Sequence, residues 1–292
     1  MTGALDVAVV IPSLTGAVEG VVESVRRQSP PPAEVEVVAG VRPSGRARNL
    51  GAARTSAPIL VFVDDDAVLG SDDTLARLVA PLAADPTVAV TGAAKLLPPG
   101  SSWFQRRVAR EVPRIEHPVV DRVVEADPPP DGPGYTDVTT TCCAVRRDVF
   151  DAVGRFDETL LRGVDTELFH RLARNGHRLV MAPGTWTWHP APPTLGALLS
   201  KHFLYGVGYS QEVRRDPSRA AGRYLHTPAH AAAYLVLRTA LLVPSIFVPW
   251  SHSAPSWRPG VKPLKALSSY AAALGYVYGW YRLRDGRSNA SV

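Results

Sequence analysis

Residues 59–66 read ILVFVDDD: five apolar residues run directly into three aspartates. A short apolar run rich in β-branched residues is typical of a buried parallel strand, which needs helices on both faces of its sheet. Open α/β sheets bind ligands in the crevice at the carboxyl ends of their strands. Asp64, Asp65 and Asp66 follow the strand at that end, so we predict a binding site there rather than a solvated run of charge.

The chain on both sides of this stretch alternates strand and helix patterns, separated by segments rich in proline. This alternation predicts a doubly wound α/β sheet. Residues 97–134 are predicted to be a variable loop with one amphipathic helix around 103–112. The predicted strands are 6–11, 34–39, 59–63, 88–93, 139–145 and 178–182, and the predicted helices are 18–25, 45–55, 72–84 with Ser71 as N-cap, one starting near Arg147, and 164–175.

Three neighbouring carboxylates at a strand end repel one another unless a cation lies between them. Hard divalent ions such as Mg²⁺ and Mn²⁺ take oxygen ligands and commonly accompany phosphate groups. One family that this pattern resembles is the haloacid-dehalogenase-like phosphatases, in which Asp64 would be the nucleophile and Asp66 a general acid. That family begins close to its acidic motif, whereas here two strand–helix units come first, so the rest of the chain decides.

Five segments, taken in order, resemble family 2 glycosyltransferases: VVIPS (9–13), ARNLG (47–51), FVDDD (62–66), GRFDE (154–158) and GVDTEL (163–168). The resemblance covers residues 6–190 and implies an inverting enzyme of the GT-A fold, whose Rossmann-like mixed sheet carries helices on both faces. It also implies a nucleotide-sugar donor, a hydroxyl acceptor and Mg²⁺ or Mn²⁺ as cofactor. Residues 37–40 lack the acidic residue with which family members often recognise uracil, so the sequence leaves the donor base open.

On the donor side, the resemblance implies that the loop after the first strand lies against the base and ribose through Pro12, Ser13 and Thr15. Arg48 would bring positive charge to the donor, and Asn49 would add hydrogen bonds. Asn49 also suits a turn or a helix cap, since asparagine favours such positions, and that alternative stays open.

At the acid triplet, the resemblance implies that Asp64 binds hydroxyls of the ribose or sugar and that Asp65 also lies on the donor side. Asp66 would coordinate the metal that bridges the diphosphate. His189 follows the last predicted strand, where similar enzymes place a histidine as a further metal ligand, and imidazole is a good ligand for Mn²⁺. The alternative is that His189 is a packed core residue.

On the acceptor side, the resemblance implies that Asp165 is the general base that takes the proton of the acceptor hydroxyl. Family members carry an acidic pair here, but this chain has Val164 in place of the first acid. This difference affects what the resemblance implies about acceptor binding, and it leaves Asp165 as the candidate base. Glu167, Trp186 and Trp188 are the other candidates for the acceptor site. Asp165 also suits a helix cap, and the tryptophans also suit a core, so both alternatives stay open.

The sequence divides into an acidic body and a basic tail. Residues 1–195 form the predicted catalytic domain, with a donor part over residues 1–96 and an acceptor part over 135–195, and residues 196–292 form a helical C-terminal region. The tail holds twelve Lys or Arg against three acidic residues, a balance of +9, while the body stands at −4 within a total of +5. A basic tail of this kind favours an anionic partner.

Two apolar stretches of the tail, residues 229–250 and 266–281, predict helices that contact a membrane. Prolines and an arginine interrupt the first, and the second is shorter than the roughly 20 apolar residues of a spanning helix. Five aromatic residues of the second stretch suit an interfacial helix: Tyr270, Tyr276, Tyr278, Trp280 and Tyr281. The alternative is that both helices pack as core.

We therefore expect an enzyme attached peripherally to the inner, cytoplasmic face of a cell membrane, acting on a lipid-linked or cell-envelope glycan. The first ten residues lack the pattern of an export signal, and Cys142 and Cys143 are adjacent, a spacing that rarely allows a disulfide. A non-catalytic nucleotide- or membrane-binding scaffold is an alternative, but the presence of Asp66 and Asp165 argues against it. Nucleic acid is not expected as a partner because no motif for it accompanies the tail arginines, which include Arg214, Arg215, Arg219 and Arg223.

Overall fold

A single mixed sheet forms the centre of the N-terminal body. The computed structural model describes residues 4–112, 114–128, 137–215, 227–247 and 261–282. The strands of the sheet follow the order β2-β1-β3-β7-β5-β8-β4, and β6 pairs with β8. Their bounds are β1 Leu5–Ser13, β2 Pro32–Ala39, β3 Ile59–Val63, β4 Val68–Leu69, β5 Val88–Leu96, β6 Val124–Glu125, β7 Cys142–Arg146 and β8 Arg178–Trp188.

The strand directions place the carboxyl ends of β1 and β3 at the same edge of the sheet. β1 pairs in parallel with β2 and β3, and β5 pairs in parallel with β8. β7 runs antiparallel between β3 and β5, with Cys142 opposite Val63 and Val145 opposite Val90. The predicted doubly wound sheet is confirmed, and β4 and β6 are short strands that the sequence does not predict.

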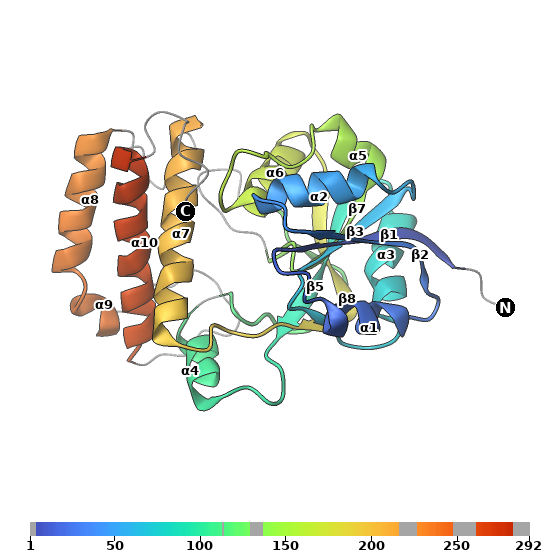
Figure 1. Cartoon of the computed structure of the whole chain (residues 1–292), viewed down its shortest axis with the longest axis horizontal. Helices are drawn as coiled ribbons and strands as arrows, with labels where there is room; N and C mark the ends of the chain where they lie inside the picture. Colours follow the sequence, from blue (N-terminus) through green and yellow to red (C-terminus); the bar gives the residue numbers. More distant parts are fainter. Residues whose placement is uncertain (1–3, 113, 129–136, 216–226, 248–260, 283–292) are drawn as a thin grey trace.

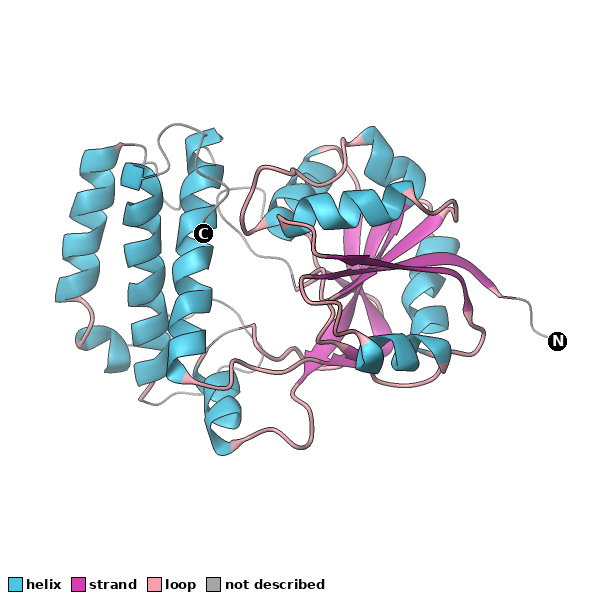
Figure 2. Ribbon diagram, in the orientation of Figure 1, coloured by secondary structure: helices cyan, strands magenta, loops and turns pink. Residues whose placement is uncertain are grey.

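Helices cover both faces of this sheet, as Figure 2 shows. One face packs on a core that includes Val21 and Leu78, and the other on a core that includes Phe150 and Leu168. The helices of the first face are α1 Glu19–Arg26 and α3 Thr74–Ala84, and those of the second are α2 Ser44–Ala53, α5 Arg147–Ala152 and α6 Val164–Arg174.

Two details of the sequence prediction are wrong. Ser71 does not cap α3, which begins at Thr74; its hydroxyl instead donates to the carboxylate of Asp73, and its carbonyl oxygen accepts from the Thr74 amide. The region 97–134 also contains β6, which pairs with β8 and was not predicted. The helix predicted around 103–112 is confirmed as α4 (Trp103–Glu111), which begins with a capping box between Ser102 and Gln105. Residues 113 and 129–134 of this region lie outside the described residues.

The C-terminal region is helical, as predicted, and its helices lie side by side at the end of the molecule opposite the N-terminus (Figure 1). The central helix is α10, which contacts both α7 and α8. Residues 248–250 of the predicted apolar stretch lie outside the described residues, as do Arg219 and Arg223. The helices are α7 Leu195–Arg215, α8 Pro228–Ala240, α9 Pro244–Phe247 and α10 Pro263–Arg282.

Glycines allow α7 to approach its neighbours at backbone distance. A Cβ atom at Gly206 would clash with the carbonyl oxygen of Ala272 on α10, and one at Gly275 would clash with that of Phe203 on α7. Further along α7, the side-chain oxygen of Gln211 accepts from the Leu161 amide at 3.1 Å. The helix therefore joins α10 to the loop that precedes α6.

No helix in the described part of the chain is long and apolar enough to cross a membrane. The aromatic residues of α10 divide between two environments, because Tyr276 and Trp280 are buried in the α7–α8–α10 core while Tyr278 and Tyr281 are exposed. The prediction that all five aromatic residues lie at a membrane interface is therefore wrong for Tyr276 and Trp280. Their rings fill the space between the helices instead.

Candidate functional site

The fold brings His189 beside the aspartates that follow β3. β4 pairs antiparallel with the end of β8, where Val68 lies opposite Trp188, and this pairing places the acidic loop next to the residue after β8. One ligand atom each of Asp64, Asp66 and His189 lie within 4.8 Å of one another. His189 Nε2 is 3.4 Å from Asp66 Oδ1. The sequence predicts this pair as metal ligands, and the structure adds Asp64.

A buried arginine holds Asp64 in place. Arg48 projects from α2, is only 5% exposed, and donates from Nη2 to Asp64 Oδ1 at 2.7 Å. Its guanidinium also lies 5.7 Å from the centroid of the Phe156 ring. A charge-assisted bond in a buried setting orients the carboxylate more firmly than an exposed ion pair does. Arg48 thus reaches the site through Asp64, and its direct contact with a donor stays a prediction.

The neighbouring His189 keeps Asp66 ionised. Partial burial alone would raise the pKa of Asp66, but the hydrogen bond and charge of His189, together with the charge of Lys201, hold that pKa below its ordinary value. A deprotonated carboxylate beside an imidazole nitrogen is ready to bind a cation at neutral pH.

These three side chains fit a divalent cation. Two carboxylates and one imidazole supply the oxygen and nitrogen donors that Mg²⁺ and Mn²⁺ accept, and their ligand atoms are close enough to share one ion. Two carboxylates at this separation also repel each other, which a cation would relieve. The His189 side chain is largely buried but lies beside the half-exposed Asp66, so metal binding by His189 stays a prediction and the core alternative stays open.

The loop after β1 ends at the same edge of the sheet as the acid triplet. Ser13 is buried, and its hydroxyl accepts from the Gly16 amide at 3.0 Å, so this side chain shapes the turn. Thr15 is exposed and accepts from the Ala17 amide at 3.2 Å. Pro12 and Asp65 are half-buried. Donor contact by Pro12, Ser13, Thr15 and Asp65 stays a prediction.

Asn49 is bound on several sides by the protein. Its Nδ2 donates to the Phe156 carbonyl oxygen and to Glu158 Oε1, each at 2.9 Å, and its Oδ1 accepts from the Phe156 amide at 3.1 Å. The side chain is buried and ties α2 to the turn at residues 154–158. In the structure Asn49 therefore has a structural role, which is to hold a neighbouring turn and not to cap a helix. A hydrogen bond from Asn49 to the donor stays a prediction.

Asp165 lies in the first turn of α6 but is not its cap. The cap position belongs to Gly163, whose φ of 78° suits glycine, and a Cβ atom there would collide with Glu212 of α7. Asp165 Oδ1 accepts from the Thr166 amide at 2.9 Å. Burial chiefly raises the pKa of the Cys143 thiol, and the charges of Asp165 and Asp64 act on that pKa in the same direction.

The remaining acceptor-side candidates have partners within the protein. Both carboxylate oxygens of Glu167 accept from Arg171, at 2.8 and 2.6 Å. The Trp186 ring packs against Gly70 and meets the Trp188 ring edge-on, with centroids 6.5 Å apart. Trp186 also contacts the hydrophobic core, which agrees with the core alternative for that residue. Acceptor binding by Glu167, Trp186 and Trp188 stays a prediction.

Apart from Arg48, the sequence prediction includes no basic residue near the acidic group. Lys95, near the end of β5, is buried, and its charge interacts with those of Asp64, Asp165 and Lys201. Two features of the sequence could have pointed to Lys95. Only four of the 32 basic residues are lysines, and Lys95 is the one charged residue in a largely apolar predicted strand and its extension.

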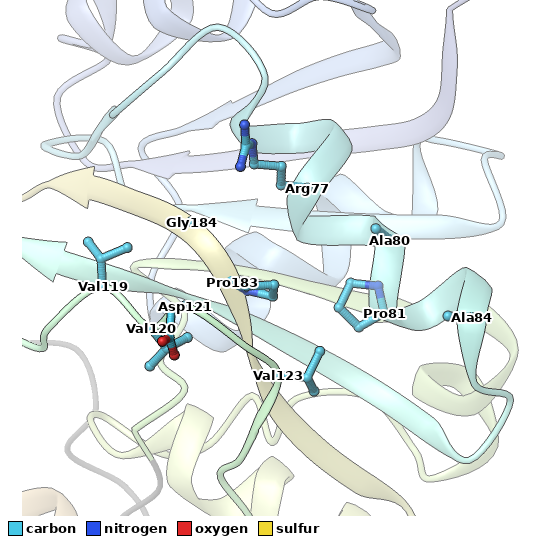
Figure 3. Close-up of a pocket in the computed structure, with 10 residues that line it drawn as sticks. All are labelled: Arg77, Ala80, Pro81, Ala84, Val119, Val120, Asp121, Val123, Pro183 and Gly184. Atoms are coloured by element: carbon cyan, nitrogen blue, oxygen red, sulfur yellow. The ribbon is translucent and has the colours of Figure 1, made fainter.

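A pocket of about 780 Å³ lies elsewhere, between α3 and β8 (Figure 3). Its lining is largely apolar and includes Pro81, Val119, Val123 and Pro183. None of the predicted site residues line it, so we treat it as separate from the acidic site.

One solved structure shares the fold of this chain, and a second is less similar. A mannosyltransferase from Pyrobaculum calidifontis, PcManGT in complex with GDP-Man and Mn²⁺, has a TM-score of 0.59 at 20% identity, covering 96% of this chain and 88% of that one. S. aureus TarS, residues 1–349, has a TM-score of 0.47 at 14% identity, covering 97% of this chain and 92% of that one. The predicted GT-A architecture is thereby confirmed by the first of these structures.

The sequence comparison assigns the family. No curated protein matches the chain. Residues 2–204, more than two thirds of the sequence, match the family described as glycosyltransferase like family 2. This match spans the whole acidic site, so the phosphatase alternative for Asp64 and Asp66 is not supported. The chain belongs to glycosyltransferase family 2 and is a glycosyltransferase.

Proposed function

We propose that this enzyme transfers a sugar from a nucleoside-diphosphate sugar to an acceptor hydroxyl, with inversion at the anomeric carbon. The observation that carries the proposal is the convergence of Asp64, Asp66 and His189 within 4.8 Å at the carboxyl end of β3. Ligands of open α/β sheets bind at this edge. The fold shared with a GDP-mannose-bound mannosyltransferase agrees with such a donor.

Asp66 and His189, with Asp64, would hold Mg²⁺ or Mn²⁺. When bound, the ion supplies positive charge against the diphosphate leaving group. Arg48 orients Asp64 through a hydrogen bond to its carboxylate. The exposed loop at Thr15 and the half-buried Asp65 border the same edge and would contact the nucleoside.

Asp165 would act as the general base. As the acceptor oxygen attacks the anomeric carbon, its proton passes to the Asp165 carboxylate, and the bond between the sugar and the nucleoside diphosphate breaks on the opposite side. Attack from the side opposite the leaving group inverts the configuration. One oxygen of Asp165 accepts from the Thr166 amide, which fixes the carboxylate while leaving the second oxygen for the proton.

A thermal-shift screen of nucleoside diphosphates tests the donor assignment. In the presence of Mn²⁺, one of GDP, UDP or dTDP is expected to raise the melting temperature, because a ligand that binds only the native state stabilises it. A ligand at a hundred times its Kd adds about 2.7 kcal/mol, which for a chain of this size corresponds to roughly 4–5 °C.

The matching nucleosides and metal-free samples are the controls for this screen. They are expected to produce smaller shifts, since they lack the diphosphate or the cation. If no nucleoside diphosphate stabilises the protein with either Mg²⁺ or Mn²⁺, the donor proposal is wrong.

We also infer that the C-terminal helices lie on the inner face of a cell membrane, where a lipid-linked or cell-envelope acceptor would be found. The supporting observation is a set of exposed apolar side chains at the end of the molecule remote from the sheet, on α8 and around α9 (Figure 1). Val236 is 71% exposed and Phe247 65%, and Leu237 and Val243 are also exposed. The balance of +9 in the tail suits anionic lipid.

Replacing Val236 and Phe247 with serine is expected to weaken binding to vesicles of phosphatidylglycerol and phosphatidylcholine by about tenfold or more. Burying a valine or phenylalanine contributes about 1.5–3 kcal/mol, and a tenfold change corresponds to about 1.4 kcal/mol. Added salt should weaken binding of the unmodified protein as well. Vesicle co-sedimentation measures both effects.

The control is Val35→Ser, which removes an exposed valine, 42% exposed, from β2 on the N-terminal body. It is expected to bind vesicles as the unmodified chain does. Equal binding by the Val236 and Phe247 variant would show that this surface does not contact the membrane.

A further inference from the structure

A buried lysine without a carboxylate partner lies close to the acidic site. Lys95 is 8% exposed, and its Nζ donates to the Arg114 carbonyl oxygen at 2.9 Å. Across the described residues it forms no ion pair. A buried ammonium is unfavourable unless it is neutralised or paired. Burial, with the charges of Arg114 and Lys201, lowers the pKa of Lys95 to about 7, while the charges of Asp165 and Asp64 act in the opposite direction.

Three cationic side chains converge from separate parts of the fold. Lys95 comes from β5, Arg114 from the segment after α4, and Lys201 from α7. The charges of Arg114 and Lys201 both act on Lys95, and the Lys95 ammonium contacts the Arg114 backbone directly. Lys201 is half-buried and has no hydrogen-bond or ion-pair partner in the described part of the chain. Asp137 is a carboxylate that acts electrostatically on both Lys95 and Arg114 and offsets part of their positive charge.

This cationic cluster, defined as Lys95, Arg114 and Lys201, borders the proposed reaction centre. Asp64 and Asp165 act electrostatically on Lys95, and Lys201 acts on Asp66. The backbone supports the same placement: the His117 amide donates to the Lys95 carbonyl oxygen, and the His189 amide donates to that of Leu96, the next residue. The cluster therefore lies beside the acidic group, on the side from which α7 approaches.

Resting on the proposed function, we propose that Lys95, Arg114 and Lys201 form an anion-binding subsite that receives a phosphate group of a substrate. A phosphate oxygen accepts hydrogen bonds from ammonium and guanidinium groups, and its negative charge offsets their mutual repulsion. Two sources share this chemistry: the diphosphate of the donor and a phosphate carried by the acceptor. The position of Lys201 on α7 makes the C-terminal region part of the active site.

Calorimetric titration of Lys95→Met and Lys201→Met tests the subsite and separates the two sources. The first titrant is the nucleoside diphosphate found in the thermal screen, with Mn²⁺, and its nucleoside serves for comparison. The second titrant is inorganic phosphate, added to the protein already saturated with nucleoside diphosphate and Mn²⁺. Lys265→Met, on α10 outside the cluster, is the matched control.

If the subsite binds the donor, both variants are expected to lose roughly ten- to hundredfold in affinity for the nucleoside diphosphate and little for the nucleoside. If it binds an acceptor phosphate, nucleoside diphosphate affinity is retained and the phosphate affinity of the saturated protein falls by a similar factor. Lys265→Met should match the unmodified chain in both titrations.

Wild-type affinity of both variants for both titrants would overturn the subsite while leaving the donor proposal intact. If the unmodified chain binds no nucleoside diphosphate, the donor proposal fails, and titration of phosphate alone still tests the cluster. Lys95→Met should melt no lower than the unmodified chain, since it removes a buried charge with no carboxylate partner. If it misfolds nevertheless, Lys201→Met, at a half-buried helix position, decides the question by itself.

Discussion

Replacing Asp165 with asparagine is expected to lower turnover by roughly 10²- to 10⁴-fold, the usual contribution of a general base. The amide has nearly the same shape as the carboxylate, and its oxygen can still accept from the Thr166 amide, as Asp165 Oδ1 does at 2.9 Å. What is lost is the ability to take the acceptor proton. The measurement is release of nucleoside diphosphate from the donor that the thermal screen identifies.

Donor binding and stability provide the internal controls for Asp165→Asn. Affinity for the nucleoside diphosphate with Mn²⁺ should be unchanged, because Asp165 is not among the grouped metal ligands. The melting temperature should also hold, since Gly163 and not Asp165 occupies the cap position of α6. Near-native turnover in a variant of native stability would remove Asp165 from the base role and turn attention to Glu167 and Asp157.

Replacing Asp66 with alanine is expected to abolish the Mn²⁺-dependent part of nucleoside diphosphate binding and to reduce turnover by more than about 10²-fold. A bound ion contributes several kcal/mol of charge stabilisation in reactions of this type, and about 1.4 kcal/mol corresponds to each factor of ten in rate. Asp66 is one of only three grouped ligands in the described structure. The thermal shift with and without Mn²⁺ measures the binding effect directly.

Asp72→Ala is the matched control for Asp66→Ala. Asp72 is an exposed carboxylate six residues further along the chain, and its ion pair with Arg27 is long at 3.8 Å. Its loss should leave the Mn²⁺-dependent shift intact. Conversely, an undiminished shift in Asp66→Ala would exclude Asp66 from the metal site. The two substitutions at Asp66 and Asp165 should thus separate loss of binding from loss of turnover.

The sequence predicts the sheet well where apolar patterning is local. β3 and the acids after it are visible because five consecutive apolar residues, four of them buried, are followed by three aspartates that are not buried. The direction of β7 is not visible in this way, since a buried strand has the same pattern in either direction. α7 was also not individually predicted, because glycines and polar residues such as Gly206 and Ser210 form its buried surface.

The site shows the same division between local and distant information. Asp66 and His189 were found from their positions after strands, and the structure confirms that they lie together. Lys95 was missed because the groups around it come from distant parts of the chain, 19 residues away for Arg114 and further for Lys201. Asn49 illustrates the opposite limit: its sequence position suggests a ligand, while its observed hydrogen bonds join α2 to residues 156 and 158.

The two adjacent cysteines of β7 have a practical consequence for every variant discussed above. Both are buried at the centre of the sheet, between β3 and β5, and burial raises the pKa of the Cys142 thiol to about 12 and also raises the pKa of the Cys143 thiol. Alkylating reagents react with thiolates, which are scarce at neutral pH under these conditions. Labelling therefore requires the central strands to separate. The rate at which a thiol reagent modifies these two cysteines therefore measures how often the sheet opens. The measurement needs no reporter residue introduced by mutation.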